Sequence, residues 1–102
     1  MSTPDPALHI RITPRARQDL KAIWMYTLER WGEPQADLYL RQLDAGIRSL
    51  LDFTNLGESC EHVRAGYRRL LVNRHLVFYR YVESHIEVVR VLHQSMDVPH
   101  HL

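Results

Sequence analysis

Seven histidines are the most conspicuous chemistry-bearing side chains among the 102 residues, because imidazoles bind metal ions and transfer protons. His100 and His101 lie near the C-terminus, and His93 precedes them by seven residues. Structural zinc sites combine four Cys and His ligands at short spacings, whereas Cys60 is the only cysteine and no two histidines are spaced H-x-x-x-H. We therefore expect no metal site and no cofactor, and we interpret histidines at strand ends as polar edge residues.

Arginines on the expected strands suggest a second kind of chemistry, the metal-free cleavage of RNA. This reaction needs a general acid and a general base, together with cations that stabilise the phosphate. Arg80, Arg90 and His93 are the candidate residues, and Arg80 and Arg90 could lie close together across the last hairpin. The alternative is that these arginines pair with carboxylates such as Glu87, each surface pair contributing only about 0–1 kcal/mol. The residues alone leave both interpretations open.

Hydrophobic periodicity and capping signals predict the elements that position these side chains. Thr13 and Pro14 are a typical N-cap and first helical residue. Gly32 can end that helix with a positive φ, and Pro34 can begin the next, so the helices must form a hairpin. The predicted elements are a strand over residues 8–12, helices over 14–31 and 34–52, and strands over 67–72, 75–82 and 85–93.

The apolar residues of each helix form one stripe. The first stripe begins at Ala16, includes Trp24 and ends at Trp31. The second stripe includes Leu43 and has the same three- and four-residue spacing, which is typical of a helix with one buried face. If buried, Trp24 and Leu43 should each cost about 2–5 kcal/mol of stability when truncated to alanine.

The last three strands are joined by short turns, which requires antiparallel neighbours. The fold class is therefore α+β, in the order β-α-α-β-β-β, with a helical hairpin packed on an antiparallel sheet. The second face of this sheet carries apolar residues that we expect no element of the chain to cover, so we expect a partner there. These outward residues are Val77, Tyr79, Tyr81, Val89 and Val91. We expect one domain over residues 1–102, with a loose N-terminus over 1–7 and a C-terminal tail over 98–102.

Charge and composition restrict the class of partner and the compartment. Thirteen basic residues against 12 acidic ones give a net charge of +1, without the basic excess typical of nucleic-acid-binding proteins. We therefore expect no direct sequence-specific contact with nucleic acid. The single cysteine suits a reducing compartment. No apolar run is long enough for a membrane span, and residues 1–6 lack the features of a signal peptide. We expect a cytoplasmic protein without membrane contact.

Three segments carry a resemblance to a known family. They are WGEPQADLYLRQL in the helical hairpin, GYRRLLVNRHLVFYRY in the first strand hairpin, and IEVVRVLHQSMD in the last strand and its tail. Together they resemble the ParE toxins of bacterial type II toxin–antitoxin systems, and the similarity extends from Leu8 to Leu102. The ending VRVLHQSMD followed by HHL is its most specific part.

The resemblance implies a RelE/ParE-type fold and an activity that is not hydrolytic: the inhibition of DNA gyrase. It also implies a ParD-like antitoxin that wraps the toxin in a hetero-oligomer and covers apolar surface on the sheet and the helical hairpin. Candidates for contact with gyrase are His93, Gln94, Met96 and Asp97. Candidates for contact with the antitoxin are Tyr39, Tyr79, Tyr81, Val89 and Val91.

A RelE-like, ribosome-dependent messenger RNA endonuclease is the alternative within the same fold. Such proteins are typically strongly basic and place Lys, Arg and a C-terminal Tyr or His around the message. This chain is nearly neutral, has Lys21 as its single lysine and has no tyrosine after Tyr81. His93 remains available for such a reaction, together with Arg80 and Arg90. We favour the gyrase inhibitor.

Overall fold

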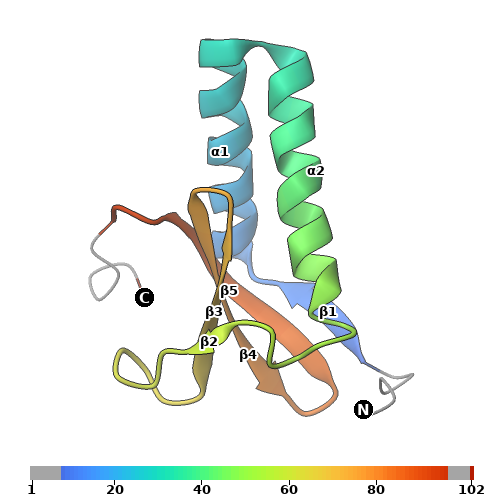
Figure 1. Cartoon of the computed structure of the whole chain (residues 1–102), viewed down its shortest axis with the longest axis vertical. Helices are drawn as coiled ribbons and strands as arrows, with labels where there is room; N and C mark the ends of the chain where they lie inside the picture. The colour runs from blue at the N-terminus through green and yellow to red at the C-terminus, as the bar shows by residue number, and fades with distance from the viewer. Residues whose placement is uncertain (1–7, 97–101) are drawn as a thin grey trace.

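The computed structural model describes residues 8–96 and Leu102, which form two helices on a five-stranded sheet (Figure 1). The elements are β1 (His9–Ile12), α1 (Pro14–Trp31), α2 (Glu33–Ser49), β2 (Glu58–Ser59), β3 (Tyr67–Val72), β4 (His75–Val82) and β5 (His85–His93). This order and the α+β class confirm the prediction. The two-residue β2 was not predicted, because it lies in a connector without periodicity. No helix in the described part of the chain is long and apolar enough to cross a membrane.

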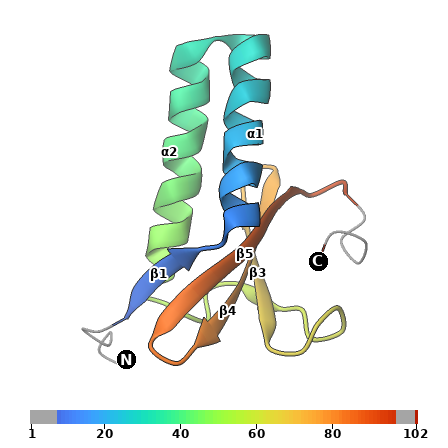
Figure 2. The same ribbon diagram turned by 180° about the vertical axis from the view of Figure 1, so that it is seen from behind.

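The sheet has the strand order β1-β5-β4-β3-β2 and is mixed rather than wholly antiparallel. The pairs β3–β4 and β4–β5 are antiparallel, as the short turns predicted. β1 pairs in parallel with β5, and Figure 2 shows the two strands side by side. A parallel pair needs a long crossover connection. Here the whole chain between the two strands, including both helices, provides it.

The helical hairpin covers one face of the sheet, and its far end extends beyond the strands (Figures 1 and 2). Thr13 caps α1 by accepting a hydrogen bond from the amide of Ala16 at 3.1 Å. Gly32 has a φ of 89° at the end of α1, as predicted. The core between helices and sheet contains Ala16, Ile23, Leu43, Ile47, Val77, Val88 and Val91.

Trp31 does not belong to this core, which corrects the predicted end of the apolar stripe. Its side chain is 62% exposed, because the last turn of α1 lies beyond the edge of the sheet. The ring of Tyr26 makes an edge-on contact with it at 6.3 Å between centroids. Trp24, about two turns nearer the sheet, instead donates its indole N–H to Asp37 on α2 at 3.0 Å.

The second face of the sheet is partly covered by the chain itself, so the prediction of an uncovered face was wrong. The connector between α2 and β3 places Cys60 and Val63 against this face, and Leu102 packs there as well. The resulting cluster consists of Cys60, Tyr67, Phe78 and Leu92, with Val63, Leu76, Val89 and Leu102 packed around it.

A β-bulge in β5 explains why both faces of this strand looked apolar. Phe78 pairs with Arg90 while the next residue of β4 pairs with Val88, so Val89 is an extra residue in β5. The bulge reverses the alternation of side chains. Val88 and Val91 therefore both face the helices, whereas Val89 packs on the second face.

Candidate functional site

Residues 93–96, which end β5 and lead toward the C-terminus, form one turn, the tail turn. The amide of Gln94 donates to the carbonyl oxygen of Arg74, in the β3–β4 turn, at 3.0 Å. The amide of Met96 donates to the carbonyl oxygen of His93, also at 3.0 Å. The side chains of Gln94 and Met96 are exposed. The structure thus brings three predicted gyrase-contact residues together, and the fourth, Asp97, lies outside the described residues.

A cluster of aromatic rings lies beside this turn. The hydroxyl of Tyr39 on α2 lies 2.6 Å from Nδ1 of His75 on β4. His75 faces His93, with the two rings edge-on at 5.3 Å between centroids. Burial lowers the pKa of His75 to about 4, and the proximity of His93 contributes to the same shift. His75 is therefore neutral at neutral pH, and its Nδ1 can accept the proton of the Tyr39 hydroxyl.

The family resemblance indicates Tyr39 as an antitoxin contact, and the sequence pattern indicates His75 as a polar edge residue. The structure shows that the Tyr39 ring is partly exposed and that its hydroxyl is used inside the chain. The two residues are 36 positions apart and lie on different kinds of element. No local pattern relates them, so the contact could not have been predicted from the sequence.

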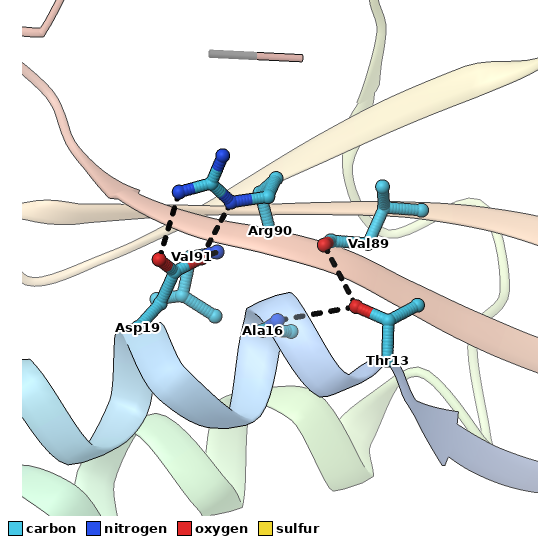
Figure 3. Close-up of polar contacts among 6 residues, drawn as sticks. All are labelled: Thr13, Ala16, Asp19, Val89, Arg90 and Val91. Atoms are coloured by element: carbon cyan, nitrogen blue, oxygen red, sulfur yellow. Dashed lines mark hydrogen bonds and ion pairs between the residues drawn. The ribbon is translucent and has the colours of Figure 1, made fainter.

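Arg90, a candidate for the nuclease alternative, is bound to α1 by Asp19 (Figure 3). Its Nε lies 2.8 Å from one carboxylate oxygen of Asp19, and its Nη2 lies 2.9 Å from the other. The amide of Val91 donates to the same carboxylate at 3.0 Å. The Arg90 and Asp19 side chains are only 11% and 14% exposed. The hydrogen bond from Arg90 to Asp19 raises the pKa of the guanidinium above its usual value, although burial acts in the opposite direction.

Arg80 is likewise bound by a carboxylate, because its Nη2 lies 2.9 Å from an oxygen of Glu87. In the register of β4 and β5, Arg80 lies opposite Glu87, Arg90 opposite Phe78, and His93 opposite His75. The sequence left open whether Arg80 and Arg90 approach each other across the hairpin or pair with carboxylates, and in the structure each arginine pairs with a carboxylate. Two of the three nuclease candidates are therefore bound by acidic side chains of the chain itself.

Tyr79, predicted to contact the antitoxin, belongs to the chain's own core and is 1% exposed. Its hydroxyl donates to the carbonyl oxygen of Thr54 at 2.8 Å and accepts the amide hydrogen of Gly57 at 3.0 Å. It therefore fastens the connector to the sheet. The expectation that Tyr79 faces a partner was wrong, because its ring fills the space beneath this connector.

Val91 is also buried, at 2% exposure, because the bulge turns it toward the helices. This corrects its assignment to an outward surface. Val89 is partly exposed and packs on the second face, whereas Tyr81 is 54% exposed near the β4–β5 turn. Of the predicted antitoxin contacts, Tyr39, Tyr81 and Val89 thus retain some accessible surface.

A groove of about 420 Å³ lies along the helical hairpin. It is lined by the aliphatic residues Ile12, Leu20, Leu40 and Ile47 and by the charged residues Asp37, Arg41 and Asp44. Most of these residues belong to α2, and Arg41 and Asp44 are exposed. An apolar groove with a charged margin is suited to an amphipathic peptide segment. The sequence alone points to none of these residues as contacts, because the groove exists only where α1, α2 and β1 meet.

Within residues 8–96 and Leu102, no group of three His, Cys, Asp or Glu side chains is placed to hold a metal ion. His100 and His101 lie outside the described residues. Cys60 is fully buried, and burial raises the pKa of its thiol, which disfavours the nucleophilic thiolate.

Comparison with known proteins identifies the family. Residues 10–98 match the model of the ParE toxin of the type II toxin–antitoxin system parDE. The chain is 46% identical to Toxin ParE1 of Caulobacter vibrioides over 92 residues, which cover 90% of this chain and 95% of that protein. It is 44% identical to Toxin ParE1 of Mycobacterium tuberculosis over 92 residues, with 89% and 94% coverage.

A solved structure shares the fold. A chain of the chromosomal ParDE toxin–antitoxin system from P. aeruginosa matches with a TM-score of 0.76 at 19% identity, covering 85% of this chain and 96% of that one. The family model and the two relatives extend over nearly the whole chain. This protein therefore belongs to the ParE toxins of type II toxin–antitoxin systems.

Proposed function

We propose that this toxin inhibits DNA gyrase by binding it through the turn at the start of the C-terminal tail, and that a ParD-like antitoxin neutralises it in the cytoplasm. The gyrase-contact residues would be His93, Gln94 and Met96, with Asp97 following them in the sequence. In this proposal the toxin acts by binding and has no catalytic centre.

The observation that carries this proposal is the arrangement of charged and exposed groups around β5. Cleavage of a phosphodiester would need free cations near a general base. Arg80 and Arg90 are instead bound by Glu87 and Asp19. Gln94 and Met96 are exposed and are fixed by backbone hydrogen bonds, which is the condition for contact with a large partner at low entropic cost. Membership of the ParE family supports the same conclusion.

A supercoiling assay with purified gyrase, relaxed plasmid and ATP tests the proposal. The wild-type toxin should abolish supercoiling at micromolar concentration. The double variant Gln94→Ala/Met96→Asp should require at least about tenfold more toxin, which corresponds to the loss of about 1.4 kcal/mol of binding free energy.

A matched control is available at the far end of the helical hairpin, where Gln35 and Met25 are also exposed. Gln35→Ala/Met25→Asp makes the same chemical changes there and should inhibit like the wild type. Undiminished supercoiling with the wild-type toxin would refute gyrase inhibition. Equal loss of inhibition in both double variants would show that the tail turn is not the specific contact.

The antitoxin is proposed to lie in the groove of the helical hairpin and to extend to Tyr81. The groove supplies aliphatic area together with the exposed charge of Arg41. Arg41→Glu should weaken the binding of a ParD-like antitoxin by about tenfold in calorimetry. Arg64→Glu, at an exposed site in the connector, is the control with the same charge change. Equal affinities of the two variants would exclude the groove.

A further inference from the structure

One polar cluster connects three parts of the chain that are distant in sequence: α2, the β3–β4 turn and the start of the tail. Arg74 lies at its centre and uses both of its backbone groups. Its amide donates to the hydroxyl of Tyr39 at 3.3 Å, and its carbonyl oxygen accepts the amide of Gln94 at 3.0 Å. A displacement of this turn would therefore be transmitted directly to the first residue of the tail.

The Tyr39 hydroxyl makes two contacts with defined directions. It accepts from the Arg74 amide, so its own hydrogen is free to point at Nδ1 of His75, 2.6 Å away. The neutral state of His75 makes Nδ1 an acceptor with the ring proton on Nε2. The edge-on packing of His75 against His93 then fixes the side chain that ends β5.

His93 continues this arrangement into the tail. Its Nδ1 lies 2.7 Å from the hydroxyl oxygen of Ser95 and accepts the Ser95 amide hydrogen at 3.1 Å. The carbonyl oxygen of His93 accepts the amide of Met96. Every backbone amide from Gln94 to Met96 is thus bonded to a group of the cluster.

We infer that Tyr39 and His75 are positioning residues, which hold the His93–Met96 turn in the orientation that contacts the target of the toxin. This inference rests on the proposed function of the tail turn in binding gyrase. Neither residue needs to touch gyrase. Their effect is to keep the turn ordered before binding, so that less conformational entropy is lost when the complex forms.

Amide hydrogen exchange tests the positioning directly and does not depend on gyrase. Tyr39→Phe removes the hydroxyl and with it the hydrogen bonds to the Arg74 amide and to Nδ1 of His75. Exchange of the Gln94 amide should become about fivefold faster, the factor equivalent to a net hydrogen-bond contribution of about 1 kcal/mol. Tyr26→Phe is the matched control, because Tyr26 is 55% exposed on α1 and lies outside the cluster. Equal exchange at Gln94 in both variants would overturn the inference.

A pair of substitutions at His75 separates the hydrogen bond from the packing. Asn offers an acceptor at about the position of Nδ1, whereas Leu fills similar space without one. His75→Asn should retain slow exchange at Gln94, and His75→Leu should resemble Tyr39→Phe. If Asn and Leu behave alike, the contact with Tyr39 does not position the tail.

Supercoiling inhibition by the same variants then gives the functional outcome. Tyr39→Phe and His75→Leu should need about fivefold more toxin for half-inhibition, and His75→Asn should act like the wild type. Faster exchange with unchanged inhibition would overturn the role in target binding. If the wild-type toxin does not inhibit gyrase, the proposed function fails, while the exchange measurements still decide whether Tyr39 and His75 order the tail.

Discussion

The ion pair between Asp19 and Arg90 should be one of the most energetically important polar contacts of this toxin. Both side chains are nearly buried, and the Asp19 carboxylate accepts three hydrogen bonds, two from Arg90 and one from the Val91 amide. β1 pairs only with residues 85–88 of β5, so the Val91 amide lies at an edge of the strand without a neighbouring strand, and Asp19 accepts its hydrogen bond. The same carboxylate links α1 to the sheet (Figure 3).

Asp19→Ala would remove the carboxylate that binds the buried guanidinium of Arg90 and the backbone amide of Val91. Removing one member of a buried pair costs about 3–5 kcal/mol. The loss of unfolding free energy should be about 3 kcal/mol here, because more than a tenth of each side chain remains exposed. A domain of this size has a total stability of about 5–15 kcal/mol. The melting temperature should fall by about 12–24 °C, at about 4–8 °C for each kcal/mol.

The control is Asp44→Ala, which removes the carboxylate of a surface pair on α2. Asp44 and Arg48 are 57% and 70% exposed, so their pair should contribute about 0–1 kcal/mol. Urea denaturation followed by circular dichroism gives both free energies of unfolding. If Asp19→Ala costs no more than Asp44→Ala, the inference that the buried carboxylate secures α1 to β5 is refuted.

Three further predictions follow from other parts of the fold. The pKa of His75 falls from 6.5 to about 4 on folding, so the unfolded chain binds a proton first as the pH decreases. His75 should not affect the stability above pH 6.5, and it should lower the free energy of unfolding by about 1–2 kcal/mol between pH 6.5 and 4, after allowance for the partial exposure of the ring. The urea midpoint of His75→Asn should not show this decrease with pH. If the urea midpoints of wild type and His75→Asn change with pH in parallel, the prediction is contradicted. Gly57→Ala should cost at least about 1–3 kcal/mol, because a Cβ would lie 2.5 Å from a backbone carbonyl oxygen of β3; an unchanged melting temperature would exclude the close approach. Val91→Asp should abolish folding, because it buries a charge. Tyr81→Asp should leave the circular dichroism spectrum unchanged and weaken antitoxin binding, because Tyr81 is exposed. A folded Val91→Asp variant would show that Val91 lies on the surface.

The local signals in the sequence determined the elements of this toxin. Thr13 and Gly32 mark the two ends of α1, as predicted, because capping depends on hydrogen bonds and φ angles within a few residues. The short turns determined that the last three strands are antiparallel. The sequence also carried the family resemblance and indicated the tail residues His93, Gln94 and Met96, which the structure places in one turn.

Contacts between distant residues were decided by the tertiary structure alone. The bulge at Val89 reversed the predicted faces of β5, because alternation fails wherever a strand gains an unpaired residue. Asp19 and Arg90 are separated by 71 positions, and no periodicity relates them. The same holds for Tyr39 and His75. Periodicity reports which side of an element faces the core, but only the packing of α1 and α2 on the sheet determines which polar groups are paired inside it and which remain available to a partner.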